Sequence, residues 1–289
     1  PDPDEFQVAF IGDSSVWGVL LENDNTLAGC LNQNVHFTVD GRRLVAYNLG
    51  YPVLSVFKDA LILDRALDYD VDAVVWLTTL QAFWEFEQLR HPIVTANVAE
   101  VRAFIEAHDL DIMADALPTL TGWERTLVGQ RRELSDWLRF QVYGVGWWLT
   151  GDDYASGGYL GAPVRNLPDS LGILDQPQIA FGNLDAQDVL AWEVLQTGFS
   201  LAAEREVPML LVNEPIYRSD GLNSDVRYNE YYPQWAYDEY RASLTALASA
   251  NEWPFIDLWD AVPPTAFTDT PFHYDAEAVC DVSELMLPH

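Results

Sequence analysis

The sequence has almost no lysine. Among 289 residues the only one is Lys58, and 15 basic residues stand against 45 acidic ones. The formal charge of −30 repels phosphate backbones and anionic membrane surfaces, so we expect no nucleic-acid partner. An acidic, lysine-poor surface fits a high-salt habitat, an extracellular protein, or a protein that its charge keeps soluble. Charge alone does not choose among the three.

Long apolar runs are also missing. No stretch of about 18 apolar residues occurs, so no membrane span is predicted. The longest runs, such as Ala73 to Leu77, have the length of a strand. The chain starts at Pro1 instead of Met, which favours a leader that was removed or left out. We therefore expect an extracellular or cell-surface location.

Cysteine is scarce, and the motifs of several enzyme classes are absent. Cys30 and Cys280 fit no metal-binding spacing, and no His-x-x-x-His pair occurs, so neither a metal nor a cofactor is predicted. No Gly-x-Ser-x-Gly elbow is present, which disfavours an ordinary α/β-hydrolase. The two cysteines are either ordinary small buried residues or one disulfide between the first and last helices.

What the sequence does have is a large apolar content and a regular alternation of short runs. With 49% hydrophobic residues it can bury a substantial core. Strand-like runs alternate with helical segments, and this alternation predicts a parallel sheet covered on both faces. The expected strands are Gln7–Ile11, Leu44–Leu49, Ala73–Leu77, Met209–Val212 and Phe255–Leu258. The expected helices are Thr26–Leu31, Ser55–Leu67, Ala96–Ala107, Trp123–Val142, Ala186–Ala203, Gln234–Ala250 and Ala276–Leu287.

We predict one domain over residues 1–289, with a flavodoxin-like three-layer α/β/α fold and a five-stranded sheet. Between about residues 84 and 183 the strand signal lapses, which indicates a mainly helical insertion. Within it, Asp152–Pro168 is rich in Gly, Pro and Tyr and is expected to be a loop. A strand order of 2-1-3-4-5 would place the first and last helices on one face, where a disulfide between Cys30 and Cys280 could form.

Polar clusters follow the first three strands, where a parallel sheet collects its reactive groups. They are Gly12-Asp13-Ser14-Ser15, Asn48-Leu49-Gly50 and Thr78-Thr79-Leu80-Gln81, and Asp269 to His273 form a fourth before the last helix. Nucleophilic catalysis by serine needs a hydroxyl, an imidazole base, a carboxylate that orients the base, and donors for the oxyanion. Ser14, His273, Asp269, the backbone N–H groups of Ser14 and Gly50, and the Gln81 amide could supply these groups.

These four clusters resemble the ordered blocks of SGNH/GDSL hydrolases, namely Gly-Asp-Ser, Asn-x-Gly, Gly-x-Asn-Asp and Asp-x-x-His. The resemblance covers roughly residues 7–83 and 205–285. It implies Ser14 as nucleophile, His273 and Asp269 as its partners, and Gly50 as an oxyanion donor. The stretch from Gly12 to Leu31 is similar to SGNH-like proteins that acetylate or deacetylate cell-surface polysaccharides. The implied activity is that of a serine esterase or acyl transferase, with an O-acetyl group on a carbohydrate as the expected ester.

The sequence departs from this pattern in two places. Gln81 stands where the third block would have Asn, so its amide is either an oxyanion donor on a longer stem or a structural group. Asp269 precedes His273 by four residues instead of three, and Asp275 is the reserve candidate. Because of these departures, a surface or assembly protein that uses the same scaffold without catalysis remains the alternative.

Further polar and aromatic residues are candidates for the same edge of the sheet. Asn48 and Glu214 are candidate substrate contacts, although Glu214 is also suited to a helix cap or loop anchor. Ser15 could rival Ser14. The aromatic stretch Tyr231–Tyr240 is either a sugar-binding wall or part of the core. We expect a small-molecule or carbohydrate ester as substrate, and a homo-oligomer is a candidate assembly.

Overall fold

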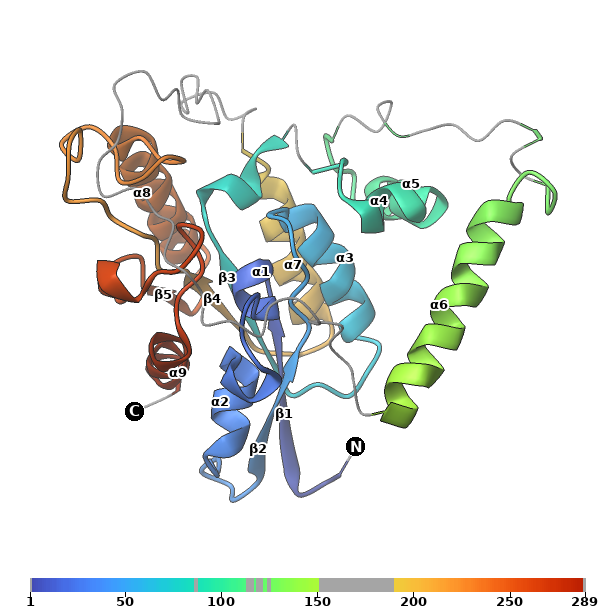
Figure 1. Ribbon diagram of the computed structural model, residues 1–289, viewed down its shortest axis with the longest axis horizontal. Helices are drawn as coiled ribbons and strands as arrows, with labels where there is room; N and C mark the ends of the chain where they lie inside the picture. Colours follow the sequence, from blue (N-terminus) through green and yellow to red (C-terminus); the bar gives the residue numbers. More distant parts are fainter. Residues whose placement is uncertain are drawn as a thin grey trace. The chain divides into compact units, whose positions relative to one another are not determined.

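Five parallel strands form one sheet in the predicted order β2-β1-β3-β4-β5 (Figure 1). The strands are β1 (Glu5–Ile11), β2 (Arg43–Asn48), β3 (Ala73–Thr78), β4 (Met209–Asn213) and β5 (Phe255–Asp257). This computed structural model describes residues 2–85, 88–112, 117, 122–123, 126–150 and 190–287. Each strand lies within a few residues of its predicted bounds. The flavodoxin-like α/β/α prediction is confirmed.

The chain divides into two compact units, one of residues 1–112 with 163–289 and one of residues 113–162. The sheet lies in the first unit. In the second unit the structure describes helix α6 (Arg131–Thr150). A single domain with a helical insertion at about 84–183 stays a prediction.

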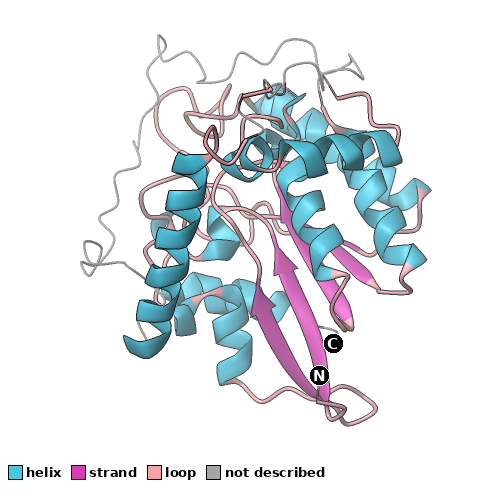
Figure 2. Cartoon of the chain, turned by 90° about the vertical axis from the view of Figure 1, so that its right-hand side faces the viewer, coloured by secondary structure: helices cyan, strands magenta, loops and turns pink. Residues whose placement is uncertain are grey.

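Helices cover both faces of the sheet (Figure 2). On one face, α2 (Leu27–Gln33) and α9 (Ala276–Leu285) pack together over a core that includes Val8 and Phe10 of β1. On the other, α3 (Val56–Ala66) packs against α7 (Trp192–Glu204). Successive residues of a strand point to opposite faces, so strands buried on both sides read as continuous apolar runs.

The first and last helices of the sequence prediction do meet on one face, and a disulfide joins them. Cys30 of α2 and Cys280 of α9 are bonded, with their Cα atoms 5.2 Å apart. The disulfide prediction is therefore confirmed, and the alternative of two ordinary buried thiols is wrong. A covalent bond spans 250 positions of sequence at this point.

The remaining elements are short, apart from α8, and several surround the edge of the sheet where the strands end. They are α1 (Ser14–Trp17), α4 (Pro92–Ala96), α5 (Val98–Ala107), α8 (Gln234–Ala250) and the 3-10 helices η1 (Asn23–Asn25), η2 (Leu80–Phe83) and η5 (Pro264–Ala266). Periodicity cannot reveal a helix as short as α1, because four residues make barely one turn.

The expected helix Trp123–Val142 is wrong at both ends, since α6 begins at Arg131 and continues to Thr150. The preceding residues form a turn in which the Gly129 N–H donates to the Thr126 hydroxyl. The expected helix Ala186–Ala203 begins at Trp192 instead, and its residues 186–189 lie outside the described residues. The expected loop Asp152–Pro168 also lies outside them.

Candidate active site

The turn that carries Ser14 connects β1 directly to α1. The Asp13 carboxylate accepts from the Ser15 N–H at 2.7 Å and so caps the short helix. Glycine is required before it, because a Cβ on Gly12 would lie 2.6 Å from Val16 Cγ2 and 3.1 Å from Leu77 O. The sharp turn places Ser14 at the start of α1, at the carboxyl edge of the sheet.

His273 and Asp269 stand beside Ser14 in a continuous chain of hydrogen bonds. The Nε2 atom of His273 lies 2.7 Å from Ser14 Oγ, and its Nδ1 lies 2.9 Å from Asp269 Oδ1. A carboxylate only accepts, so the proton between Nδ1 and Asp269 belongs to the ring. Nε2 is then the acceptor for the Ser14 hydroxyl. The structure thus brings together the three residues that were predicted as nucleophile, base and orienting acid.

A tight loop explains how Asp269 reaches the histidine from four residues away. The Thr268 N–H donates to His273 O at 2.8 Å, and Phe267 pairs with Tyr274 in an antiparallel bridge. The chain therefore returns on itself between these two pairs. The Thr268 hydroxyl also donates to Asp269 Oδ1 at 3.1 Å, which helps to orient the carboxylate. The additional residue is accommodated in the loop, and the triad distances are ordinary hydrogen-bond distances.

The carboxylate of Asp269 stays ionised. Partial burial by itself would raise its pKa, but the hydrogen bond from His273 and the charge of that ring outweigh burial, so the pKa is lowered. Asp275, the reserve candidate, has another task. Its side chain accepts from the Ala278 N–H at 3.0 Å and caps α9.

The Ser15 hydroxyl is hydrogen-bonded beneath the turn. Among the described residues, no hydrogen bond joins Ser15 to His273. Its hydroxyl donates to Glu214 Oε2 at 2.6 Å. Glu214 itself has no exposed surface, so the prediction of a substrate contact there is not supported. Burial, and then the negative charge of nearby Asp13, raise the pKa of the Glu214 carboxyl well above its usual range. Glu214 is a buried anchor of the nucleophile turn.

Gly50 lies against α1, where no side chain would fit. A Cβ on Gly50 would come 2.4 Å from Trp17 N and 2.7 Å from Val16 Cβ. Its N–H, predicted as an oxyanion donor, donates here to Asn48 Oδ1 at 3.0 Å. Asn48 also donates from Nδ2 to Trp17 O at 3.2 Å, so the predicted substrate contact instead ties the Gly50 loop to α1.

Gln81 lies on η2, directly after β3. Its backbone N–H donates to the Tyr232 hydroxyl at 3.2 Å. Its side-chain oxygen is buried and has no hydrogen-bond partner among the described residues. An unpartnered buried amide oxygen is uncommon in a folded protein. Among the described residues, no structural hydrogen bond holds the Gln81 side chain through this oxygen.

The aromatic stretch Tyr231–Tyr240 is mainly core. Tyr232, Tyr237 and Tyr240 are fully buried, and the Tyr237 and Tyr240 hydroxyls reach Asn213 at the end of β4. A sugar-binding wall over this whole stretch is therefore wrong. The sequence prediction also missed two buried groups below the site, the Ser15–Glu214 pair and Lys58, although the rarity of lysine was a signal for the second.

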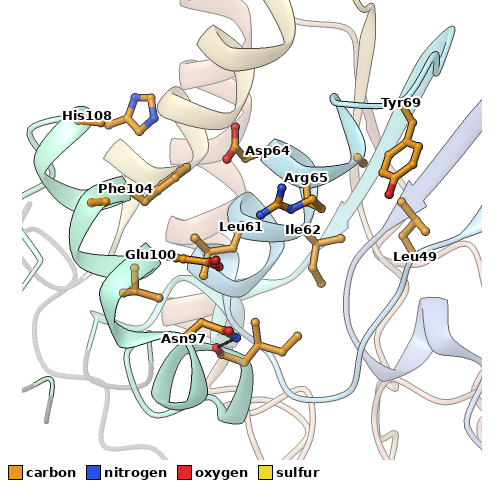
Figure 3. Close-up of a pocket in the computed structure, with 15 residues that line it drawn as sticks. Leu49, Leu61, Ile62, Asp64, Arg65, Tyr69, Asn97, Glu100, Phe104 and His108 are labelled. Atoms are coloured by element: carbon orange, nitrogen blue, oxygen red, sulfur yellow. Dashed lines mark hydrogen bonds between the residues drawn. The ribbon is translucent and has the colours of Figure 1, made fainter. Parts of the chain in front are cut away.

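Cavities of very different size flank the edge of the sheet. A cavity of about 670 Å³ lies between α3 and α5, lined by residues such as Leu61, Glu100 and Phe104, and it contains neither Ser14 nor His273 (Figure 3). A space of about 10 Å³ touches both of these residues. It has room for about one water molecule.

Two kinds of feature are not found in the part of the chain that the structure describes. No helix there is both long and apolar enough to cross a bilayer. No group of three or more His, Cys, Asp or Glu side chains is placed to hold a metal ion, within the same residues.

Comparisons with protein-family models and with curated proteins return no match for this sequence. Solved structures that match include a GDSL-like lipase from Bacteroides thetaiotaomicron (12% identity, TM-score 0.44, 99% of this chain and 88% of that chain). They also include a member of the lipolytic G-D-S-L family from Veillonella parvula (10%, 0.44, 97% and 97%). A third is the carbohydrate acetylesterase Est24 from Sinorhizobium meliloti (11%, 0.43, 98% and 96%). Such identities and TM-scores transfer no chemistry to this chain.

Proposed function

We propose that this protein is a serine ester hydrolase or acyl transferase of the SGNH/GDSL type. The observation that carries the proposal is the chain of hydrogen bonds from Ser14 Oγ through His273 to Asp269, at 2.7 and 2.9 Å. A serine hydroxyl is a weak nucleophile until an adjacent base accepts its proton. The three groups stand in this relation without any rearrangement.

In the proposed mechanism, His273 Nε2 takes the Ser14 proton as Oγ attacks the ester carbonyl. Asp269 keeps the ring in the tautomer that leaves Nε2 free to accept, and it stabilises the imidazolium that forms. The imidazolium then donates its proton to the departing alcohol, which leaves an acyl group on Ser14. Water, or the hydroxyl of an acceptor, releases the acyl group by the reverse proton transfers.

The oxyanion of the tetrahedral intermediate needs donors on the other side of Ser14. The backbone N–H groups of Ser14 and Gly50 and the amide of Gln81 are the candidates. For Gly50 this role requires that its N–H leave Asn48 Oδ1 when the substrate binds. The Gly50 N–H would therefore become available as an oxyanion donor only when the substrate binds.

We further propose a small acyl group, an acetyl, carried by a carbohydrate. The resemblance of the stretch from Gly12 to Leu31 motivates this choice. Two partly exposed rings next to Gly50, Trp17 and Tyr51, are paired edge to face at 5.8 Å, and aromatic faces suit the apolar faces of sugars. The disulfide supports the extracellular or cell-surface location, because disulfides persist in oxidising compartments.

The test is turnover of short aryl or sugar acetates by the wild type, by Ser14→Ala and by Ser15→Ala. Loss of Ser14 should lower kcat by about 10⁴-fold or more, whereas Ser15→Ala removes a neighbouring hydroxyl that has no contact with the base and should keep most of the activity. Acetyl esters should be turned over faster than octanoyl esters. Equal rates for wild type and Ser14→Ala would refute the proposal.

The alternative is a surface or assembly protein on the same scaffold that has lost catalysis. It would be favoured by a Ser14 and a His273 too far apart to interact, together with a pocket filled by side chains. The 2.7 Å distance between Ser14 Oγ and Nε2 counts against it. The space of about 10 Å³ beside these two residues is not an open cleft and does not count against it.

A further inference from the structure

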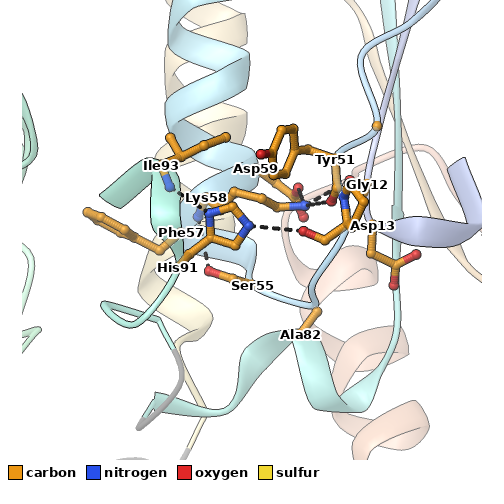
Figure 4. A network of polar contacts seen from close by, with 12 residues as sticks. Gly12, Asp13, Tyr51, Ser55, Phe57, Lys58, Asp59, Ala82, His91 and Ile93 are labelled. Carbon is orange, nitrogen blue, oxygen red and sulfur yellow. Dashed lines mark hydrogen bonds and ion pairs between the residues drawn. The ribbon is translucent and has the colours of Figure 1, made fainter. Parts of the chain in front are cut away.

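The only lysine of the chain is buried directly below the candidate site. The side chain of Lys58 has no exposed surface. Its ammonium group donates to Gly12 O at 2.8 Å and to Tyr51 O at 2.7 Å, and it forms an ion pair with Asp59 Oδ1 at 2.6 Å (Figure 4). Two hydrogen bonds to carbonyls and one ion pair therefore surround the buried ammonium group.

The two carbonyls belong to the two segments that the proposed reaction must hold together. Gly12 precedes the nucleophile turn, and Tyr51 follows Gly50. The Tyr51 N–H also donates to Gly12 O at 3.0 Å, so this carbonyl accepts from both the backbone and Lys58. Lys58 thus bridges the segment that carries the nucleophile and the segment that carries a candidate oxyanion donor.

The loop whose Tyr51 carbonyl accepts from Lys58 has a strained backbone. Val53 has a φ of 76°, a left-handed conformation that is unfavourable for a β-branched residue. Such a conformation persists only where surrounding contacts fix it. One such contact comes from His91, whose Nδ1 accepts from the Ile93 N–H at 3.1 Å and whose Nε2 therefore donates to Pro52 O at 2.9 Å. Lys58 and His91 fix consecutive carbonyls of this loop.

The chemistry of the residue fits this position. An ammonium group presents three donors from one atom and can serve two carbonyls and a carboxylate at once, whereas the guanidinium of arginine is a planar fork. Burying a charge is unfavourable unless it is fully paired, and here the neighbouring Asp59 pairs it. The Asp59 carboxylate also accepts from the Trp76 indole at 3.3 Å, which anchors the pair to β3.

We propose that Lys58 is a positioning residue for the proposed ester hydrolysis: by joining the Gly12 and Tyr51 carbonyls, it holds Ser14 and the Gly50 N–H at the separation that the reacting carbonyl requires. Lys58 touches neither the substrate nor the reacting atoms. The proposal rests on the proposed function, and it names a residue outside the triad and the oxyanion donors.

The test compares Lys58→Met/Asp59→Asn with Asp59→Asn alone. The double variant removes the bridge without leaving a buried charge unpaired, and the single variant keeps both bonds to the carbonyls. Leu63→Ala is a matched control, because it weakens the same helix at a fully buried position five residues beyond Lys58. Small misplacements of reacting groups can lower rates by about 10²-fold, so we expect the double variant to lose about 10- to 100-fold in kcat with little change in KM. Leu63→Ala should stay close to the wild type in kcat. Asp59→Asn leaves the buried ammonium group without its ion pair, so it should lose stability but keep more of its kcat than the double variant.

Amide hydrogen exchange over residues 12–17 and 49–54 gives a second measurement that does not depend on activity. Exchange in both segments should accelerate in the double variant and stay unchanged in Leu63→Ala. If this double variant does not fold, Lys58→Leu/Asp59→Asn replaces it, since a leucine side chain offers no donor to either carbonyl. The proposal is overturned if the double variant matches Asp59→Asn in kcat, or if exchange in the two segments does not change. A wild type that is no more active than Ser14→Ala would refute the proposed function instead, and the exchange comparison would still decide whether Lys58 holds the segments.

Discussion

The proposed active site has two sides. On the base side, His273 lies at hydrogen-bond distance from both Ser14 and Asp269. On the oxyanion side, the Gly50 N–H donates to Asn48, and the Gln81 side-chain oxygen has no partner among the described residues. The base side is complete in the free protein. On the oxyanion side, the Gly50 N–H is still hydrogen-bonded to a side chain of the protein. The base side therefore needs no rearrangement before the proposed reaction, whereas the oxyanion side does.

The two sides are also held by different means. His273 lies three residues before α9, which the disulfide ties to α2. The Gly50 N–H donates to Asn48, and Lys58 and His91 donate to carbonyls of the same loop. A covalent bond thus secures the helix next to the base, and buried polar side chains secure the oxyanion loop.

The largest effect should come from breaking the base side. Asp269→Asn should lower kcat by roughly 10³–10⁴-fold, because an amide can donate to Nδ1 and favour the other tautomer, and it carries no charge to stabilise the imidazolium. Steady-state kinetics with an acetyl ester measure this. Asp275→Asn is the control, since that carboxylate caps α9 and does not touch His273. Similar losses in both variants would mean that Asp269 acts only through stability.

Removing the disulfide should show what the covalent connection contributes. Cys30→Ser/Cys280→Ser opens a loop of 250 positions, and the loss of chain constraint should lower the free energy of unfolding by about 5 kcal/mol. Denaturant unfolding measures it, and the wild type treated with a reductant should behave like the variant. An unchanged midpoint would show that packing between α2 and α9 suffices without the bond.

The oxyanion side should respond more weakly. If Gln81 donates to the oxyanion, Gln81→Ala should lower kcat by about 10²–10³-fold and change KM little. Gln81→Glu, with nearly the same shape, should be worse still, because a carboxylate would repel the developing charge. A Gln81→Ala variant with unchanged kcat would assign the oxyanion to backbone donors alone.

The smallest effect concerns Glu214 below the turn. Its pKa, raised by burial and then by Asp13, means that the folded protein keeps a proton that the unfolded chain releases near the ordinary value of 4.5. Stability from this group is therefore fully present below that pH and is lost as pH rises toward the folded pKa, by at most about 1.4 kcal/mol per pH unit.

Glu214→Gln stays neutral at every pH and should escape this loss. The stability of the wild type minus that of the variant should therefore fall as the pH rises above about 5 in denaturant titrations. Carboxylates that do not interact with Glu214 cancel in this difference. A difference that is constant with pH would show that Glu214 ionises in the folded protein as it does in the unfolded chain.

Much of the fold could be predicted because it depends on local patterns. Alternating apolar runs fixed the strands, and the handedness of parallel connections restricted the strand order. The motif spacing placed Ser14 and His273 at the same edge, although 259 positions separate them. The helix α6 was misplaced because turn and helix residues are mixed around its start.

By itself, the sequence determined the sheet, the residues at its carboxyl edge and the two cysteines that could pair. Only the tertiary structure decided how these groups are used. The loop from Phe267 to Tyr274 brings Asp269 to the histidine, a backbone path that residue spacing alone does not reveal. Burial turned Glu214 from a candidate contact into an anchor of the nucleophile turn and placed Lys58 within hydrogen-bond distance of two carbonyls. The physical reason is that the protonation state and partners of a polar group depend on its distance from other chain segments and from water, which folding sets.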